Sequence, residues 1–340
     1  MPAGSLVIIA IPTLAAGPLL ELCLDALNAQ IFRSFEVIVI NNGFDNGLSA
    51  VRPERWAFPF RILSPGCNVG FGAAINLAIR DSSSTYVVTL NDDTEPRPEW
   101  LLSLVREMDA DPRAGMCASR IELRQSGTID SAGMMICFDG SSRQRGHSQP
   151  SKSFEHSGEV LFPSGCAAMY RRSMLDAIGL FDEKFFLYCE DTDLGLRARW
   201  AGWTCRYVPD AVVEHHYSRT AGAFSVMKAY FVERNRLWVA LKNFPGPLLL
   251  LVPFVSLVRY FWQFVASRGS NGAAAQFIRS GNSLFGVASI LVRAHWETLL
   301  HLPRLLRKRA EVNKTRHLGS MEFTRLMYRH RISPRDIARL

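Results

Sequence analysis

The sequence predicts an α/β fold: a mixed, mainly parallel sheet with flanking helices, followed by a helical C-terminal region. Over the first 120 residues, short apolar runs rich in β-branched residues alternate with helical stretches, as expected for βαβ units. Polar clusters directly follow several of these runs, and after about residue 221 the chain becomes helical, first apolar and then basic. An apolar fraction of 48% with 21% charged residues excludes a disordered chain.

The first part of the chain contains six segments with a clear pattern. Residues 6–11 form an unbroken apolar run rich in β-branched residues, which is typical of a strand covered on both faces. In chain order, strands are expected at residues 6–11, 35–40, 60–63 and 86–90, and helices at residues 18–30 and 72–80. In a sheet built this way, ligands bind just beyond the carboxyl ends of the parallel strands.

The middle of the chain is less regular. Residues 120–158 are polar and rich in Ser and Gly, so we expect them to leave the sheet. A regular sequence pattern resumes over residues 160–172, and a helix is expected near residues 173–178. Two short strands, at residues 204–208 and 211–214, then close this part of the chain.

After the sheet, the sequence becomes helical and strongly apolar. Residues 227–243 predict a helix, and a Pro-Gly-Pro sequence separates it from the apolar residues 248–266. Pro253, Arg259 and Gln263 interrupt that stretch, and an arginine is expensive at bilayer depth. We therefore favour an interfacial or re-entrant helix over a membrane span. A helical oligomerisation domain, for example in a homodimer, is the alternative.

The charge and the cysteines indicate where the protein works. The net charge is +8 at pH 7, and residues 301–340 carry eleven Lys and Arg against three Asp and Glu. Apolar aromatic residues beside a basic run suit the anionic inner leaflet of the cytoplasmic membrane. Nucleic-acid binding is not expected, because the first 300 residues carry no net charge. Seven scattered cysteines without a C-x-x-C pair fit a reducing cytoplasm.

Polar side chains gather at the expected strand ends. These positions would meet at one edge of the sheet and outline a crevice of nucleotide size. The clusters are Pro12 with Thr13, Asn41 with Asn42, residues 68–72, and residues 91–93.

Asn91, Asp92 and Asp93 follow an expected strand and could hold a divalent cation. Mg²⁺ prefers one or two carboxylates together with phosphate oxygens and water. The alternative is that these side chains only bond their own backbone in a turn, as Asn and Asp commonly do.

A second acidic stretch contains Glu190, Asp191 and Asp193, where a helix is expected to open at Asp191. We interpret Asp193 as a helix cap. The stretch follows a strongly apolar, aromatic segment, and a carboxylate beside such a wall can acquire the raised pKa that a general base needs. His215 closes the last expected strand, and it is either a structural residue or a neutral metal ligand.

At this point the motifs resemble a known family, the inverting family 2 glycosyltransferases of the GT-A fold, especially their rhamnosyltransferase-like branch. The resemblance covers most of residues 6–218 and includes five motifs in order. They are EVIVINNGFDNG, NVGFGAAIN, LNDDTEPRPEWL, the long segment PSGCAAMYRRSMLDAIGLFDEKFFLYCEDTDLGLRARWAGW, and YVPDAVVEHH. The long segment is the most specific, because its SG, GxFDExFF and EDxDLxxR elements are in register.

The resemblance implies a role for each motif. Asp93 corresponds to the metal-binding acid of the family's D-x-D motif, and Asn91 stands in the place of its first member. Asp191 corresponds to the catalytic base, with Glu190 beside it, and His215 to the histidine near the metal and the diphosphate. The residues expected to line the nucleotide pocket are Pro12, Thr13, Asn41, Asn68, Gly70, Asn91 and Asp92.

Two positions depart from the family pattern. Asn41 stands where the family usually has Asp, which replaces a charged contact to the base by an amide and leaves nucleotide preference open. Leu14 replaces a common Asn, which removes another polar contact. Neither change removes the metal-binding acid or the general base.

The resemblance implies an inverting glycosyltransferase that uses Mg²⁺ or Mn²⁺. The donor would be dTDP-rhamnose or a UDP-sugar, and the acceptor a saccharide or polyprenyl-diphosphate-linked saccharide in bacterial surface polysaccharide synthesis. The enzyme would be cytoplasmic and peripheral to the membrane. Its catalytic domain would span residues 1–222, with a nucleotide-binding half at about 1–119 and an acceptor half at about 159–222, before a helical region at 223–340. The alternative is a catalytically inactive carbohydrate-binding or scaffold protein of the same fold.

Overall fold

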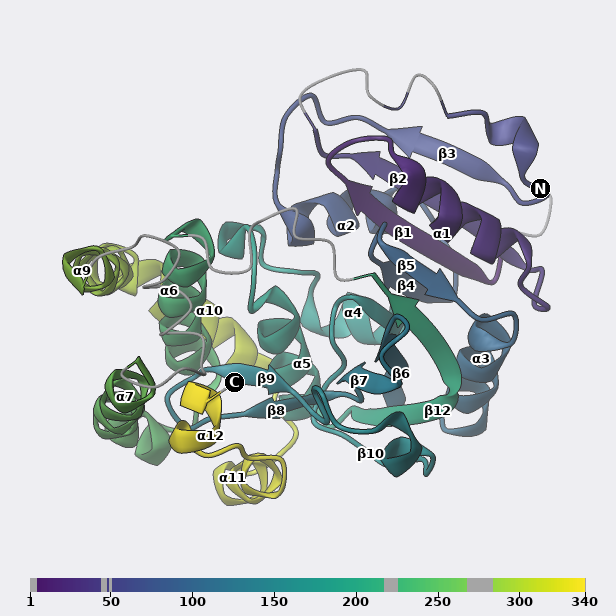
Figure 1. Ribbon diagram of the computed structural model, residues 1–340. Coiled ribbons are helices and arrows are strands. Elements are labelled where there is room, and N and C mark those ends of the chain that lie inside the picture. The colour runs from purple at the N-terminus through teal and green to yellow at the C-terminus, as the bar shows by residue number, and fades with distance from the viewer. Residues whose placement is uncertain (1–4, 44–47, 49–50, 217–225, 268–283, 340) are drawn as a thin grey trace. The chain divides into compact units, whose positions relative to one another are not determined.

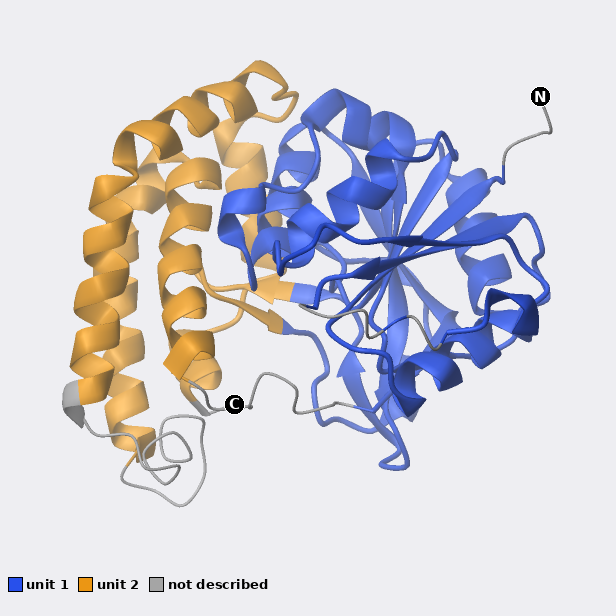
Figure 2. Cartoon of the chain, turned by 90° about the horizontal axis from the view of Figure 1, so that it is seen from above, with its two compact units in different colours: residues 1–134, 144–218 blue, residues 135–143, 219–340 orange. Residues whose placement is uncertain are grey.

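The computed structural model describes residues 5–43, 48, 51–216, 226–267 and 284–339 (Figure 1). The chain forms two compact units, which Figure 2 shows in blue and orange. The first unit comprises residues 1–134 and 144–218, and the second comprises residues 135–143 and 219–340. The chain therefore enters the second unit briefly before it completes the first.

A ten-stranded mixed sheet forms the centre of the first unit, in the order β10-β12-β6-β11-β4-β1-β2-β3. The four strands β4, β1, β2 and β3 run parallel. β11 lies antiparallel between β4 and β6, and β12 runs parallel to β6. β5 pairs with β12, and β7 pairs with β6. This topology confirms the predicted fold class. The bounds are Val7–Thr13 (β1), Phe35–Asn41 (β2), Phe60–Leu63 (β3), Tyr86–Leu90 (β4), Thr94–Pro96 (β5), Ala114–Leu123 (β6), Thr128–Ser131 (β7), Gly158–Glu159 (β10), Ala167–Arg171 (β11) and Thr204–His215 (β12).

Helices cover both faces of this sheet. Apolar side chains of α1 and α3 form one core with Val7, Ile9 and Ile11 of β1. Because side chains alternate along a strand, Ile8 and Ala10 face the other way, and α2 packs against β1 and β2. This double cover explains why the strands read as unbroken apolar runs. The helix bounds in this unit are Pro18–Asn28 (α1), Phe71–Arg80 (α2), Trp100–Ala110 (α3), Arg172–Ile178 (α4) and Glu190–Trp200 (α5), with short 3₁₀ helices at Pro53–Arg55, Ser151–Phe154 and Glu183–Phe185.

The prediction that residues 120–158 leave the sheet is wrong at residues 120–123, which belong to β6, at residues 128–131, which form β7, and at Gly158, which begins β10. β6 is an inner strand that extends to Leu123, and β7 returns antiparallel beside it. The strand is hard to see in the sequence because Arg120 and Glu122 occupy it, and these two side chains pair with each other at 2.8 Å between Nε and Oε1. Only residues 135–143 pass into the second unit.

The two short strands predicted before His215 are one strand, β12. Its pairing with β6 shifts register between Val208 and Val212, around Pro209. Proline has no N–H to donate to a neighbouring strand, so it interrupts the pairing without ending the strand.

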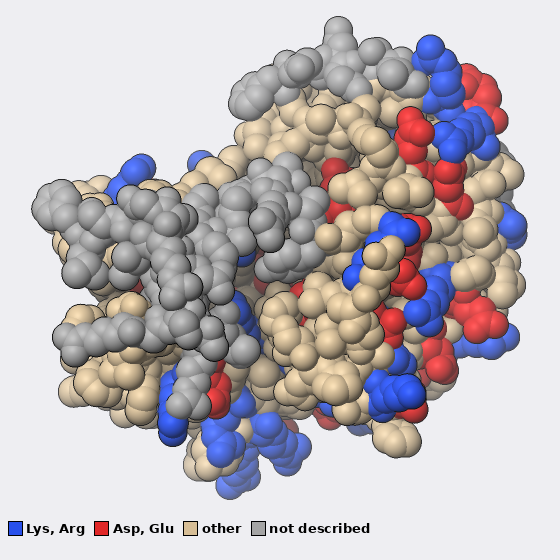
Figure 3. Space-filling model, viewed as in Figure 1, with Lys and Arg blue, Asp and Glu red and all other residues tan. Residues whose placement is uncertain are grey.

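Charged side chains are interspersed on the surface of the first unit. On the face shown in Figure 3, Lys and Arg alternate with Asp and Glu over this unit. This mixture of signs agrees with the balanced charge of the first 300 residues.

The second unit is built from helices, as the sequence predicts for the region after the sheet. The short strands Met134–Ile136 (β8) and Ser142–Gln144 (β9) pair with each other where the chain passes between the units. The helices are Val226–Asn243 (α6), Gly246–Ser267 (α7), Leu284–Leu300 (α9), Leu302–Lys314 (α10), Ser320–Arg329 (α11) and Pro334–Arg339 (α12).

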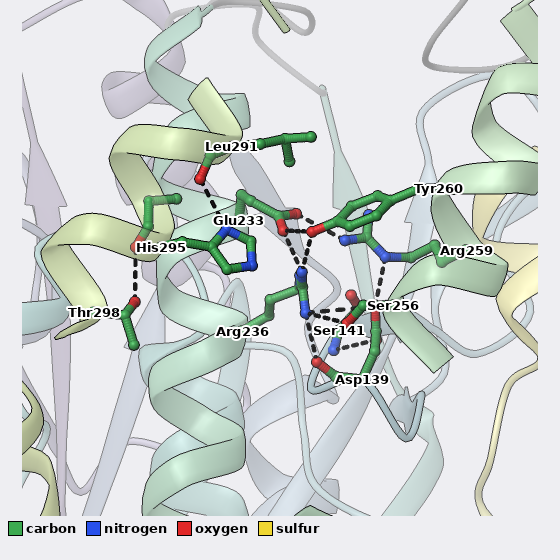
Figure 4. A network of polar contacts seen from close by, with 11 residues as sticks. Asp139, Ser141, Glu233, Arg236, Ser256, Arg259, Tyr260, Leu291, His295 and Thr298 are labelled. Atoms are coloured by element: carbon green, nitrogen blue, oxygen red, sulfur yellow. Dashed lines mark hydrogen bonds and ion pairs between the residues drawn. The ribbon is translucent and has the colours of Figure 1, made fainter. Parts of the chain in front are cut away.

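A buried network of charges holds α7 to its own unit (Figure 4). Nε of Arg259 lies 2.5 Å from Oδ2 of Asp139, and its Nη2 lies 2.8 Å from Oε2 of Glu233. Glu233 also pairs with Arg236 and accepts a hydrogen bond from Tyr260. Breaking a buried pair by removing one partner costs several kcal/mol, about 3–5. Arg259 therefore fixes one face of α7 inside the second unit.

Candidate active site

The acidic residues 91–93 lie where β4 ends, beside the end of β1. Thr13, the last residue of β1, donates a hydrogen bond from Oγ1 to Oδ2 of Asp92 at 2.5 Å. Because β1 and β4 are parallel neighbours, their carboxyl ends meet at one edge of the sheet. The sequence prediction that Thr13 and Asp92 lie close together is therefore met in the structure.

Asp93 and His215 are in direct contact. β5 pairs antiparallel with the end of β12, where Thr94 lies opposite His215. As a result, Oδ1 of Asp93 lies 3.2 Å from Nε2 of His215. Nδ1 of the same imidazole lies 2.9 Å from Oδ2 of Asp130. Asp93, Asp130 and His215 are all buried, so the ring is held between two carboxylates.

These contacts change the proton affinity of the groups. Burial raises the pKa of Asp92 to about 6, although the hydrogen bond from Thr13 opposes this, and the charge of Asp93 raises it further. Burial would lower the pKa of His215, but the hydrogen bonds and charges of Asp130 and Asp93 outweigh it and raise the pKa to about 9. These contacts therefore favour the protonated, cationic form of the ring. A metal at Nε2 would replace one of its protons.

The spacing of Asp93 and His215 fits a metal site. In an octahedral site with bonds of about 2.1 Å, adjacent ligand atoms lie about 3 Å apart. The 3.2 Å between Oδ1 of Asp93 and Nε2 of His215 is close to that value. Among the residues that the structure describes, no group of three or more His, Cys, Asp or Glu side chains is arranged to hold a metal. A divalent cation held by Asp93 and His215 would therefore need its remaining ligands from phosphate oxygens or water, as is usual for Mg²⁺.

Asn42 joins the loops that carry the expected nucleotide-pocket residues. Its N–H donates to the carbonyl of Thr13 at 2.8 Å, and its Oδ1 accepts from the N–H of Val69 at 2.9 Å. Its Nδ2 donates to the carbonyl of Gly70 at 3.4 Å. Oδ1 of Asn68 in turn accepts from the N–H of Gly70 at 2.9 Å. Thr13, Asn68 and Gly70 are thus brought to one place by a residue to which the resemblance gives no role.

Pro12 and Asn41 lie at the same strand ends. Pro12 is half-buried and stands one residue before Thr13, which is in register with Asn41. Asn41 is buried, and its Oδ1 accepts a hydrogen bond from the N–H of Gly43 at 3.3 Å. Asn41 therefore shapes its own turn, and its contact with a nucleotide stays a prediction.

Gly70 allows two distant segments to touch. Its φ is +85°, and a Cβ at this position would lie 2.3 Å from the carbonyl oxygen of Phe186. The N–H of Phe71 donates to the same oxygen at 2.8 Å. Only glycine meets both the backbone angle and the close approach. The loop before α2 is thereby joined to the loop before α5.

The loop before α5 has an unusual backbone. Phe186, Tyr188 and Cys189 have φ values of 64°, 69° and 67°, although none of them is glycine. Such conformations cost about 1–3 kcal/mol each and cluster at functional sites. They lie directly before Glu190 and Asp191, so they set the position of the first turn of α5.

Asp191 lies in that first turn and is partly exposed. Its Oδ2 accepts a hydrogen bond from the N–H of Gly165 at 3.1 Å, and its Oδ1 accepts one from the N–H of Thr192 at 2.6 Å. Burial raises the pKa of Asp191, while these hydrogen bonds oppose the change. A carboxylate with a raised pKa that is still reachable from solvent has the properties of a general base.

Glu190 has a different environment. It is buried, its Oε2 has no hydrogen-bond partner among the described residues, and its Cβ lies 3.7 Å from where a side chain on Gly72 would begin. Burial, with the charge of Asp191, raises the pKa of Glu190 well above its usual value. The protonated form of Glu190 is therefore favoured, which suits a neutral neighbour better than a base.

The interpretation of Asp193 as a helix cap is wrong. The cap position of α5 is Cys189, which makes no side-chain cap, and Asp193 is fully buried. Its Oδ2 lies 3.0 Å from Nε of Arg197, one turn further along the helix. The sequence shows the two charges but not that the pair is buried.

One short segment touches both acidic stretches. The N–H of Asn91 donates to the carbonyl of Cys166 at 2.8 Å, because β4 and β11 are antiparallel neighbours. The adjacent residue, Gly165, donates its N–H to Asp191. Residues 91–93 and Asp191 therefore lie at the same edge of the sheet. The two residues that precede β11, Gly165 and Cys166, lie between them.

Asp130 is a residue of this site that sequence reasoning missed. It lies on β7, inside the segment that was expected to leave the sheet, and it contacts His215 at 2.9 Å. A single Asp in a polar stretch looks exposed in the sequence. The only available signal is its position beside Ile129 in a short pattern of alternating residues.

Known proteins resemble this chain in sequence. A family model described as "Glycosyl transferase family 2" matches residues 8–179. An N-acetylglucosaminyl-diphospho-decaprenol L-rhamnosyltransferase from Mycobacterium tuberculosis is 30% identical over 233 residues, which are 62% of this chain and 76% of that protein. The O-antigen biosynthesis protein RfbC from Myxococcus xanthus is 26% identical over 243 residues, which are 67% of this chain and 19% of that protein.

Solved structures share the fold. The mannosyltransferase PcManGT from Pyrobaculum calidifontis, in complex with GDP-Man and Mn²⁺, has a TM-score of 0.55 at 18% identity, over 92% of this chain and 86% of that one. GalNAc-T7 with UDP, GalNAc and Mn²⁺ has a TM-score of 0.58 at 14% identity, over 79% of this chain and 51% of that one. Because the family model covers half of the chain and the fold agrees, this protein belongs to glycosyl transferase family 2 and is a glycosyltransferase of the GT-A fold.

Proposed function

We propose that this glycosyltransferase is an inverting enzyme that moves a sugar from a nucleotide-diphosphate donor to a hydroxyl of a saccharide or lipid-linked saccharide. The first donor to consider is dTDP-rhamnose, with UDP-sugars second, and the product belongs to a bacterial surface polysaccharide. The name of the Mycobacterium tuberculosis relative supports rhamnose and a polyprenyl-diphosphate-linked acceptor. The observation that carries the proposal is the contact of residues 165 and 166 with both acidic stretches.

The residues divide the work of one displacement. Asp93 and His215 would hold Mg²⁺ or Mn²⁺, which when bound stabilises negative charge on the leaving diphosphate. Asp191 accepts the proton of the acceptor hydroxyl while that oxygen forms a bond to the anomeric carbon. The bond from that carbon to the diphosphate oxygen breaks on the opposite face. The sugar goes to the acceptor with inverted configuration, the proton goes to Asp191, and the nucleoside diphosphate leaves.

We expect dTDP-rhamnose, in the presence of Mn²⁺, to raise the melting temperature of the purified chain by about 4 °C. A ligand at a hundred times its Kd stabilises a protein by about 2.7 kcal/mol. The unfolding entropy, about 2.1 cal/mol/K per residue, is about 0.7 kcal/mol/K for 340 residues, so this stabilisation corresponds to a shift of about 4 °C. The measurement is a thermal-shift panel of dTDP-, UDP- and GDP-sugars, each with Mn²⁺ and with EDTA.

The panel includes its own controls. dTDP and UDP without sugar report how much of the shift comes from the nucleotide alone. A panel in which no nucleotide sugar stabilises the chain more with Mn²⁺ than with EDTA would contradict the proposed donor class. Release of nucleoside diphosphate from the stabilising donor, with an acceptor present, separates an enzyme from an inactive carbohydrate-binding or scaffold protein, which would bind without turnover.

We further propose that the enzyme works at the cytoplasmic face of the membrane, with α7 lying in the interface. Among the described residues, α7 alone is long and apolar enough to cross a membrane; its mean hydropathy is 1.8, and 22% of its apolar stretch is buried. A span would carry Arg259 into lipid and break its pairs with Asp139 and Glu233. An interfacial position keeps these pairs.

The outer face of α7 supports this position. The polar Ser256 and Arg259 lie on its buried stripe, and the remainder exposes large apolar side chains to solvent. The basic C-terminal residues can add attraction to anionic lipids, about 1 kcal/mol for each Lys or Arg at the surface. The exposed apolar residues of α7 are Leu250, Leu251, Phe254, Leu257, Val258, Phe261, Phe264 and Val265.

The cysteines also fit a cytoplasmic position. All seven are free, which suits a reducing compartment.

We expect the double substitution Phe254→Glu with Phe261→Glu to lower vesicle binding at least 10-fold. Both rings are more than half exposed, at 67% and 58%, so the change should leave the core intact. Each ring buried in lipid contributes about 1.5–3 kcal/mol. The measurement is flotation of the purified chain with vesicles of phosphatidylcholine, with and without phosphatidylglycerol.

Ile31→Glu is the matched control, because Ile31 is 54% exposed and lies outside the second unit. It should float as the unsubstituted chain does. If the double variant floats equally well, α7 does not contact lipid. If instead it binds vesicles normally but changes from dimer to monomer in light scattering, a second copy of the chain covers this face.

A further inference from the structure

Both ring nitrogens of His215 are fixed by carboxylates from different parts of the chain. Nε2 lies 3.2 Å from Oδ1 of Asp93, and Nδ1 lies 2.9 Å from Oδ2 of Asp130. The exposed fractions are 8% for His215, 5% for Asp93 and 3% for Asp130. The ring can therefore neither turn freely nor exchange its partners with water.

A hairpin delivers Asp130 to this position. β6 runs parallel to β12 and pairs Leu123 with His215. The chain then turns and returns as β7, antiparallel to β6, with Ile129 paired to Glu122. Asp130 follows on β7, so the sheet itself, and not a surface loop, carries its carboxylate to the ring.

Asp130 is held in turn from its other side. Its Oδ1 lies 3.1 Å from Nδ1 of His147, which also lies 3.2 Å from the carbonyl oxygen of Asp130. A buried carboxylate is costly unless it is paired, and here each of its two oxygens has one imidazole partner. The result is a chain of contacts from His147 through Asp130 and His215 to Asp93.

We propose that Asp130 is a positioning residue: it binds Nδ1 of His215 and thereby directs Nε2 toward the metal held by Asp93. This inference rests on the proposed metal role of Asp93 and His215. A histidine that binds a metal usually donates its other N–H to a carboxylate, which fixes the tautomer and the ring orientation. In the structure, that second carboxylate belongs to Asp130.

The test is Mn²⁺ affinity, measured on the purified full chain by the electron paramagnetic resonance signal of free Mn²⁺. Removal of such an outer partner typically costs about 10–100-fold in metal affinity, so Asp130→Ala should weaken Mn²⁺ binding by that factor. Asp130→Asn keeps an oxygen that can accept from Nδ1, so its loss should be smaller. Melting temperatures without metal show that each variant folds.

His147→Ala is the matched control. It removes the other partner of Asp130 but leaves His215 and Asp93 with their contacts. Its Mn²⁺ affinity should stay within about 3-fold of the unsubstituted chain, well below the loss at an outer metal partner. Unchanged affinity in a folded Asp130→Ala chain would overturn the proposal, and so would an equal loss in His147→Ala.

The variants Asp93→Ala and His215→Ala separate the positioning role of Asp130 from the proposed metal site on which it depends. If both lose Mn²⁺ affinity and Asp130→Ala does not, the metal site stands and the positioning role fails. If neither loses affinity, or if the unsubstituted chain binds no Mn²⁺, the metal does not sit at this pair, and both ideas fail together.

Discussion

Replacing Asp191 with Asn should lower turnover by about 10²–10⁴-fold, the usual contribution of a general base, and leave donor binding nearly unchanged. The amide cannot take the acceptor proton. Donor binding should survive because Asp191 is joined to residues 91–93 through the backbone of residues 165 and 166. The measurements are kcat with the donor that stabilises the chain, and the thermal shift that the same donor gives.

Glu190→Gln is the matched comparison for Asp191→Asn. Burial already favours the protonated form of Glu190, and an amide resembles a neutral carboxyl, so we expect a loss of less than about 10-fold. Unchanged turnover in a purified, folded Asp191→Asn chain would remove Asp191 from the role of base. A large loss in Glu190→Gln alone would move that role to Glu190.

The pH dependence of kcat/KM should also identify Asp191 as the general base. A general base works only when deprotonated, so kcat/KM falls as the pH drops through its pKa. Burial raises the pKa of Asp191, so the fall should begin at a higher pH than for an exposed Asp, whose pKa is about 3.9. The acidic limb should vanish from the residual activity of Asp191→Asn. A limb that persists there belongs to another group.

Local pattern was enough to predict the parallel half of the sheet. β1, β2 and β4 are covered on both faces along most of their length, so each is a largely apolar run that the sequence displays directly. The predicted helix at 72–80 differs from Phe71–Arg80 by one residue. The strand ends then placed Thr13 and Asp92 at one edge, as parallel topology requires.

Buried charges were the main source of error. Arg120 and Glu122 conceal an inner strand, Asp193 resembles a helix cap but pairs with Arg197, and Asp130 resembles an exposed residue but contacts His215. In each case the deciding fact is a partner that folding supplies, so the same residue in the sequence suits either a solvated or a buried position. The positive φ values at Phe186, Tyr188 and Cys189 have no sequence signal either, because none of those residues is glycine.

Replacing Asp93 with Asn should lower turnover by about 10³-fold or more, because a metal that stabilises a leaving group contributes several kcal/mol and each 1.36 kcal/mol is tenfold in rate. Asn keeps the size of the side chain but offers the metal a neutral oxygen in place of a carboxylate. His215 would keep its contact with Asp130, so the fold should remain. The donor-induced thermal shift should lose its dependence on Mn²⁺.

The decisive form of this experiment combines the substitution with metal removal. EDTA should lower the turnover of the unsubstituted chain by about the same factor as Asp93→Asn does, and adding EDTA to Asp93→Asn should cause little further loss. Two changes that remove one interaction are not additive, whereas independent changes are. If EDTA lowers both proteins by equal factors, the metal acts somewhere other than Asp93. If EDTA lowers neither, while Asp93→Asn is inactive, Asp93 serves the reaction without a metal, and the contact between Asp93 and His215 has to be explained by proton transfer or by structure alone.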